Sequence, residues 1–260
     1  MKIGVVLHNL KLPPKEAVVH AAKLGLQGIQ PYAVREFAPE NMTGGKQREW
    51  LDLAKSHGIV FSAVCGDFSV SFAEDTEKVR SIVERSKRVL DMALCLECNV
   101  VTTHVGTVPE HECKEKDTMR RFCRELSEYA NSIGAYFAVE TGTERAAVLV
   151  EFLDSLGSKG LRVNFDPANL VMCAADDPVI GVYTLKDYIV HTHAKDGIQL
   201  APNPLAYEEL PLGQGDVDWP PYLVALRDIG FNGFLTIERE TGNQPDADIA
   251  MAADFLRSLL

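Results

Sequence analysis

The sequence of 260 residues has no uninterrupted apolar run that approaches ~20 residues, the length that crosses a bilayer. Its first residues, Met1-Lys2 and then Ile3-Gly4-Val5-Val6-Leu7, lack the basic flank, long apolar core and small-residue cleavage site of a signal peptide. We therefore expect a soluble, cytoplasmic protein that has no membrane partner.

Positive charge is also scarce. The chain has 26 Lys and Arg residues against 37 Asp and Glu, which gives a net charge of −11. Because binding to a nucleic-acid backbone depends on clustered Lys and Arg, this balance disfavours a nucleic-acid partner. A small molecule is the more natural ligand.

Two further motifs are missing. The six cysteines are scattered, and the single CxxC pair, Cys95 and Cys98, has no second pair to complete a zinc site. In a cytoplasmic protein these are expected to be ordinary free thiols. The turn after the first apolar segment contains no G-x-G-x-x-G, which disfavours a dinucleotide-binding fold.

What the sequence does contain is a regular alternation of short apolar segments and stretches with helical spacing. We expect strands at residues 2–7, 28–32, 59–64, 100–105, 136–140, 161–166, 188–193 and 233–238. We expect helices from Pro13 up to Gly25 and at residues 46–57, 76–96, 115–133, 145–156, 178–186, 219–229 and 246–259. Eight such units in one chain predict an α/β fold, a closed (β/α)8 TIM barrel that forms a single domain over residues 1–260.

Four of the expected strands end on a side chain that can bind a metal. These residues are Glu140, Asp166, His193 and Glu238, which end the fifth to eighth strands. Active sites of TIM barrels lie at the carboxyl ends of the strands, and these four strands form one contiguous half of the ring. Three carboxylates and one imidazole there predict a site for a hard divalent cation.

Each of these residues also has a simpler interpretation. A carboxylate at a strand end can cap a helix, and Asp166 begins an Asp-Pro-Ala-Asn sequence typical of a capped turn. Metal ligation is favoured for Asp166 because it shares the inward face of its strand with Asn164. His191 lies one layer deeper than His193 and is expected to be a hydrogen-bonded core residue.

Other polar residues near strand ends are candidates for substrate contact. His104 and His8 both fall on the inward face of their strands and could contact substrate hydroxyls. For His8, plain packing remains an equal alternative. Lys195 could hold an anion or an oxyanion, or it could simply be solvated.

Several segments together resemble the xylose-isomerase-like TIM barrels of the sugar-phosphate isomerases and epimerases. They are Val-Val-Thr-Thr-His-Val-Gly (100–106), Val-Glu-Thr (139–141), Val-Asn-Phe-Asp-Pro-Ala-Asn-Leu (163–170), His-Thr-His-Ala-Lys-Asp (191–196), Leu-Gly-Gln-Gly-Asp-Val-Asp-Trp (212–219) and Gly-Phe-Leu-Thr-Ile-Glu (233–238). The resemblance implies that Glu140, Asp166, His193 and Glu238 hold one divalent ion, Mn, Co, Mg or Zn. It also implies that Glu140 and Glu238 are the catalytic acid/base pair.

The sequence departs from some of these relatives in two places. Where ketose 3-epimerases carry a histidine three residues after the aspartate ligand, this chain has Asn169, and no arginine follows His193 at their spacing. Asn169 therefore joins the substrate-binding candidates, and the sugar itself is left open.

We expect a metal-dependent isomerase or epimerase that moves a proton next to a carbonyl through an enediolate of a carbohydrate substrate. The alternatives are a dehydratase acting on a keto-inositol or related keto-polyol and a non-catalytic sugar-binding relative. An abasic-site endonuclease is less favoured, because Asn169 replaces one ligand of its three-zinc cluster. Assembly into a homo-oligomer stays open.

Overall fold

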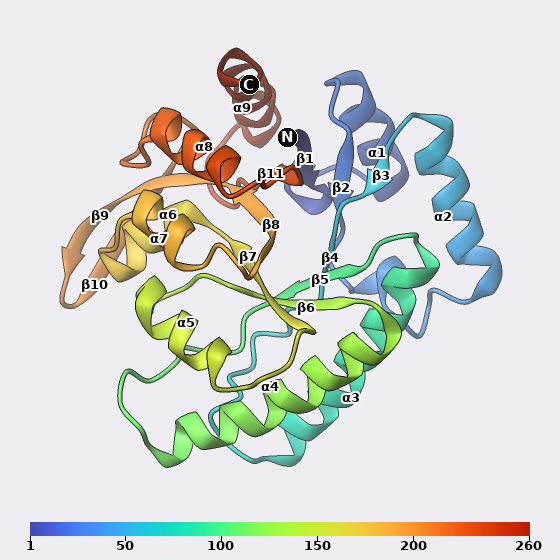
Figure 1. The fold of residues 1–260 in the computed structure, drawn as a ribbon. Coiled ribbons are helices and arrows are strands. Elements are labelled where there is room, and N and C mark those ends of the chain that lie inside the picture. Colours follow the sequence, from blue (N-terminus) through green and yellow to red (C-terminus); the bar gives the residue numbers. More distant parts are fainter.

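Nine short strands form one parallel sheet that curves into a barrel, and helices surround it (Figure 1). The computed structural model describes all residues, Met1–Leu260. The strand order is β3-β2-β1-β11-β8-β7-β6-β5-β4, so the first and last strands of the barrel pair with each other in parallel. The predicted (β/α)8 barrel is confirmed.

The barrel strands are β1 (Lys2–Val6), β2 (Gly28–Gln30), β3 (Val60–Phe61), β4 (Val64–Cys65), β5 (Val100–Thr103), β6 (Tyr136–Glu140), β7 (Leu161–Phe165), β8 (Ile189–Ala194) and β11 (Phe234–Ile237). The helices are α1 (Pro14–Lys23), α2 (Gly44–Ser56), α3 (Glu77–Cys95), α4 (Lys114–Ile133), α5 (Ala146–Asp154), α6 (Pro167–Asn169), α7 (Pro178–Thr184), α8 (Trp219–Asp228) and α9 (Pro245–Leu259). Short 3-10 turns span Leu7–Leu10 and Arg35–Phe37.

The third strand was predicted as one continuous segment, and this was wrong. It is interrupted at Ser62 and Ala63, and its two parts pair with different neighbours. β3 pairs with β2 and β4 pairs with β5, while the Ser62 amide still donates to the carbonyl of Ile29 at 2.9 Å. The interrupted strand therefore joins both edges of the sheet and closes the ring.

Helix boundaries follow local sequence signals. Pro14 occupies the first turn of α1, where no intrahelical N–H bond is lost. The Thr76 hydroxyl accepts a hydrogen bond from the Val79 amide and caps α3. α4 ends at Gly134, whose φ of 74° lies in the left-handed region that glycine adopts without strain. None of the helices combines the length and the apolar content of a membrane-spanning segment.

The two faces of the barrel strands are chemically different. Apolar residues such as Phe137, Val139 and Val163 belong to a hydrophobic core cluster of 67 buried residues. Polar residues on the other face bond to one another across the barrel, as when the Gln30 amide nitrogen donates to the Thr102 hydroxyl at 2.8 Å. The barrel interior is therefore a polar network, and the network rises towards the carboxyl ends of the strands.

Two features were not expected from the sequence. A short α6 and a π-helix (Leu170–Ala174) follow β7, and an antiparallel hairpin of β9 (Asp196–Pro202) and β10 (Leu205–Leu210) follows β8. Figure 1 shows the hairpin extending from the barrel beside α6 and α7. Both insertions lie at the carboxyl ends of the strands and shape the site described below.

Candidate metal centre

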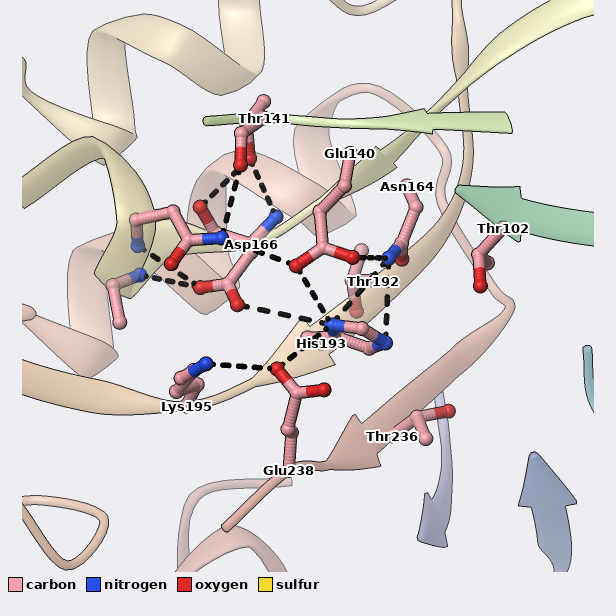
Figure 2. Close-up of polar contacts among 12 residues, drawn as sticks. Thr102, Glu140, Thr141, Asn164, Asp166, Thr192, His193, Lys195, Thr236 and Glu238 are labelled. Carbon is pink, nitrogen blue, oxygen red and sulfur yellow. Dashed lines mark hydrogen bonds and ion pairs between the residues drawn. The ribbon is translucent and has the colours of Figure 1, made fainter. Parts of the chain in front are cut away.

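The side chains that end β6, β7, β8 and β11 converge at the centre of the barrel mouth. Glu140, Asp166, His193 and Glu238 each offer one donor atom, and all four atoms lie within 4.8 Å of one another. All four residues are buried. His193 Nδ1 lies 3.3 Å from a carboxylate oxygen of Glu140 and 3.3 Å from one of Glu238 (Figure 2). The structure thus brings together the four residues that the sequence places at strand ends.

Asp166 is held so that its two oxygens have different environments. Oδ1 accepts hydrogen bonds from the amides of Ala168 and Asn169, at 2.8 and 3.1 Å, and caps α6. Oδ2 is buried, has no hydrogen-bond partner and lies 3.7 Å from His193 Nδ1. Thr141 fixes the backbone, because its hydroxyl accepts from the Asp166 amide and donates to the Asp166 carbonyl. The capping role and an available donor oxygen therefore coexist in one side chain.

His193 is oriented by a residue that the sequence analysis missed. Its Nε2 lies 3.1 Å from the Gln30 side-chain carbonyl, and the Gln30 amide nitrogen donates to Thr102. Because the Gln30 oxygen can only accept, Nε2 carries a proton, and Nδ1 faces the carboxylates. Gln30 ends the second strand on its inward face, and this position is the feature of the sequence from which its role could have been predicted.

A second polar layer supports the cluster from below. The Asn164 amide donates to Glu140 at 3.0 Å, and its oxygen lies 2.8 Å from Nδ1 of His191. Nε2 of His191 is 2.9 Å from the Thr236 hydroxyl. Burial lowers the pKa of His191 well below its usual value, so this ring is neutral and fixed between two partners. The layer restricts how far Glu140 can rotate.

Burial and neighbouring charges shift the pKa values within the cluster. Burial raises the pKa of Asp166. For Glu238, burial acts in the same direction, but the charges of His193 and Lys195 outweigh it and lower the pKa. The pKa of His193 rises well above its usual value, because Glu238 and Glu140 outweigh the effect of burial. A proton on Nδ1 of His193 is therefore favoured, and this atom faces the carboxylates of Glu140, Asp166 and Glu238. A metal cation between the same carboxylates would be stabilised in the same way.

The residues fit a divalent cation on two grounds. Asp166 Oδ2 is an orphaned, buried carboxylate oxygen directed at the cluster, which is costly unless a positive charge meets it. The donor set of three carboxylates and one imidazole also suits Mg, Mn, Co or Zn better than a soft cation.

Glu140, His193 and Glu238 of the cluster line a cavity of about 1160 Å³, and three other predicted residues line it as well. His104 is 3.0 Å from Asp67 through Nδ1 and 3.7 Å from Glu140 through Nε2. The charge of Glu140, followed by that of Asp67, raises the pKa of His104 to about 9 against the effect of burial. Asn169 donates from its side-chain amide to Glu140 at 3.1 Å.

Lys195, the third of these residues, is buried rather than solvated. Its ammonium group lies 3.0 Å from Glu238 and 2.7 Å from Glu240. Lys195 therefore holds one of the four clustered side chains in place.

His8 does not line the cavity. Its ring stacks on Tyr32 at a centroid distance of 4.9 Å, and its Nδ1 accepts the Tyr32 amide at 3.2 Å. Burial lowers the pKa of His8. The packing alternative describes this residue, because the strand ends at Val6 and a 3-10 turn carries His8 away from the inward face.

Comparison with known proteins agrees with the fold. A family model described as "Xylose isomerase-like TIM barrel" matches residues 18–259. A curated relative, an uncharacterized protein of Methanocaldococcus jannaschii, is 27% identical over 203 residues, which span 72% of this chain and 66% of the relative. The chain thus spans slightly less than two thirds of that relative's length.

Solved structures are also similar. A xylose isomerase domain protein from Planctomyces limnophilus is 27% identical, with a TM-score of 0.84 over 93% of this chain and 90% of that one. The probable 3-DHS dehydratase AsbF of Bacillus anthracis is 18% identical, with a TM-score of 0.80 over 99% of both chains. At this lower identity the likeness shows the fold alone, and the same holds for the sugar epimerases that share it.

Proposed function

The chain belongs to the xylose isomerase-like TIM barrel family, as the resemblance in its motifs suggested, and we propose that it is a divalent-metal-dependent isomerase or epimerase of a sugar or keto-polyol. The observation that carries this proposal is the convergence of four buried donor atoms within 4.8 Å, one of them an unpartnered oxygen of Asp166. Structures that share the fold include sugar epimerases.

In this proposal Glu140, Asp166, His193 and Glu238 hold the cation. A bound divalent cation supplies Lewis-acid stabilisation for the negative charge that forms on a carbonyl oxygen when the neighbouring carbon loses a proton.

Glu140 and Glu238 are the proposed acid and base. They approach His193 from opposite sides (Figure 2), which supports access to two faces of a bound carbon. Neighbouring positive charges outweigh the effect of burial and lower the pKa of both groups, so the carboxylate that acts as base is ionised at neutral pH. The carboxylate that acts as acid must first take up a proton from solvent, which it then returns to the carbon. Transfer from one face to the other gives epimerisation, and transfer between adjacent carbons on one face gives isomerisation.

Three other residues complete the proposed site. His104 and Asn169 line the cavity next to Glu140 and are proposed to contact substrate hydroxyls. Lys195 positions Glu238 through its ammonium group. Tyr32, which carries the stacked His8 ring, also lines the cavity, so His8 acts on the site only through that neighbour.

The test is solvent deuterium incorporation by metal-loaded protein in D2O, with a panel of ketoses and keto-inositols. Glu140→Gln and Glu238→Gln are each expected to reduce exchange about 100-fold or more, because an amide cannot accept the proton. Metal content measured on each variant separates loss of the base from loss of the ion. Glu128→Gln, an exposed change on α4, is the matched control.

Exchange that persisted at the wild-type rate in both site variants would contradict the two-glutamate mechanism. A dehydratase would instead release a product that has lost a β-hydroxyl, and the fold similarity to a probable dehydratase makes this the second candidate. Product analysis of the same reactions distinguishes the two. Ligand-induced stabilisation without any turnover would indicate a sugar-binding protein.

A further inference from the structure

The cavity above the metal centre is strongly acidic. Its lining includes seven carboxylate side chains but only one lysine and one arginine, Lys195 and Arg239. Because the carbonyl end of the substrate would occupy the proposed cation, a phosphate or carboxylate group elsewhere on the same molecule would need a second cation or a set of free N–H donors to replace its water.

Neither cation is free to meet an anion. Lys195 lies between Glu238 and Glu240, at 3.0 and 2.7 Å. Arg239 donates from Nη1 to Glu209 and from Nε to Asp248, both at 2.8 Å. The charge of each residue is thus already offset by two carboxylates.

Two histidines also line the cavity, and both are committed. The ring nitrogens of His104 face Asp67 at 3.0 Å and Glu140 at 3.7 Å. His193 belongs to the cluster itself, with Nδ1 3.3 Å from oxygens of both Glu140 and Glu238. Neither ring is free to bind an anion.

The two loops where this fold frequently binds phosphate are also occupied. In TIM barrels a phosphate is frequently bound by the loops that follow the seventh and eighth strands, here β8 and β11. After β11, the amides of Glu240 and Thr241 donate instead to the Glu209 carboxylate, at 3.0 and 3.4 Å. Glu209 is buried and comes from β10 of the unexpected hairpin. A carboxylate of the chain itself thus occupies two amide donors of this loop.

The loop after β8 is filled in the same way. The Asp196 carboxylate accepts the amides of Gly197, Gly213 and Val217 and the indole N–H of Trp219, at 2.8 to 3.2 Å. The loop packs so closely that a Cβ on Gly215 would lie 2.2 Å from Asp196 Oδ1. No amide of this group is left for a ligand.

Two helix N-termini close to the site are blocked too. Asp166 Oδ1 accepts the first amides of α6, and Asp176 accepts the Ala146 amide at the start of α5, at 2.8 Å. Helix N-termini are common anion sites, so their occupation by carboxylates removes another possibility.

We propose that this site takes an uncharged polyhydroxy carbonyl compound, such as a free ketose or keto-polyol, and rejects the corresponding phosphate esters and keto acids. This inference rests on the proposed function and narrows its substrate class. Carboxylates on the cavity wall, including the half-exposed Glu240, accept hydrogen bonds from hydroxyl groups but repel a phosphate dianion.

Matched pairs of ligands test the inference. Free ketoses and their phosphate esters are titrated into the Mg-loaded or Mn-loaded protein, and binding is followed by calorimetry. We expect at least one neutral compound to bind at least tenfold more tightly than its phosphate ester. Equal or tighter binding of the esters would overturn the inference, and so would the absence of binding by every neutral compound.

Deuterium exchange measured on the same samples keeps the two proposals apart. A preference for neutral ligands without exchange would leave this inference standing and refute the proposed chemistry. Exchange confined to phosphate esters would refute this inference and leave the proposed chemistry standing.

Glu209→Gln examines the group that blocks the loop after β11. The amide keeps an acceptor oxygen for the backbone but removes the charge. The ratio of the dissociation constant of the phosphate ester to that of its neutral partner is therefore expected to fall at least fivefold. Glu128→Gln, which removes one charge far from the cavity, is expected to leave the preference unchanged. An unchanged preference in Glu209→Gln would refute the role of this carboxylate, and the wild-type comparison decides the substrate class even if the variant does not fold.

Discussion

Glu144 offers a direct test of the electrostatics of the cavity. It lines the cavity wall, and its carboxylate accepts only a long hydrogen bond of 3.4 Å from the Val108 amide. Burial raises the pKa of Glu144 from 4.5 to about 7, and His104 and the backbone amides only partly oppose this. The folded protein therefore binds this proton more tightly than the unfolded chain does.

The raised pKa of Glu144 determines how the free energy of unfolding changes with pH. A pKa that is raised on folding stabilises the folded state fully below about pH 4.5, and the stabilisation is lost as the pH rises through about 7. The full difference is equivalent to about 3 kcal/mol. Because the side chain is only partly buried, solvent reduces this figure, and we expect about 1 to 2 kcal/mol.

Glu144→Gln removes the titration while keeping the shape of the side chain. Urea unfolding, followed by the fluorescence of the buried Trp50 and Trp219, gives the free energy of unfolding of both proteins. Between about pH 5 and about pH 8.5, the variant is expected to gain about 1 to 2 kcal/mol relative to the wild type. Glu128→Gln should show no such gain. If the difference between wild type and Glu144→Gln did not change with pH, the raised pKa would be wrong.

Three further predictions concern the cation, the loop after β8 and nucleic acid. Saturation with Mn, Co, Mg or Zn at about 100 times the dissociation constant is expected to stabilise the protein by about 2.7 kcal/mol in thermal or urea unfolding; Asp166→Ala is expected to lose this gain and Cys95→Ala to keep it. Asp196→Ala leaves three amides and an indole N–H without their acceptor, so we expect it to lower the free energy of unfolding by about 3 to 5 kcal/mol, measured in urea; a loss below about 1 kcal/mol would contradict this account. With a net charge of −11, the protein is expected neither to nick abasic duplex DNA nor to bind it in a salt-sensitive way, and robust nicking in a gel assay would reverse this conclusion.

Much of the fold could be predicted because its strands and helices carry strong local signals. The segment Tyr136–Glu140 is a strand with the predicted boundaries, since a buried apolar run ends abruptly on a carboxylate. Long amphipathic helices such as α3 and α4 were located to within one residue. The rule that strand ends converge in a barrel then placed the four clustered side chains together.

Other parts depend on tertiary contacts that a local pattern does not encode. The third strand divides because its two halves pair with opposite edges of the sheet, although Ser62 is the only polar residue in the predicted segment 59–64. The β9–β10 hairpin was missed because its residues, such as the half-exposed Leu200 and Tyr207, are not buried against the core. Gln30 was missed because its partner His193 lies 163 residues away along the chain.

The acidic residues of the chain have different roles that composition alone could not separate. Some form the candidate metal cluster, as Glu140 and Glu238 do. Others, Asp196 and Glu209, act as internal anions that organise the loops after β8 and β11 by accepting their amides. A carboxylate used in this way stabilises a loop and at the same time removes a place where a phosphate could bind. The hairpin that supplies Glu209 therefore connects loop stability with substrate choice. Releasing the Glu209 carboxylate would weaken the loop after β11, and the same change would free its amides to bind an anion.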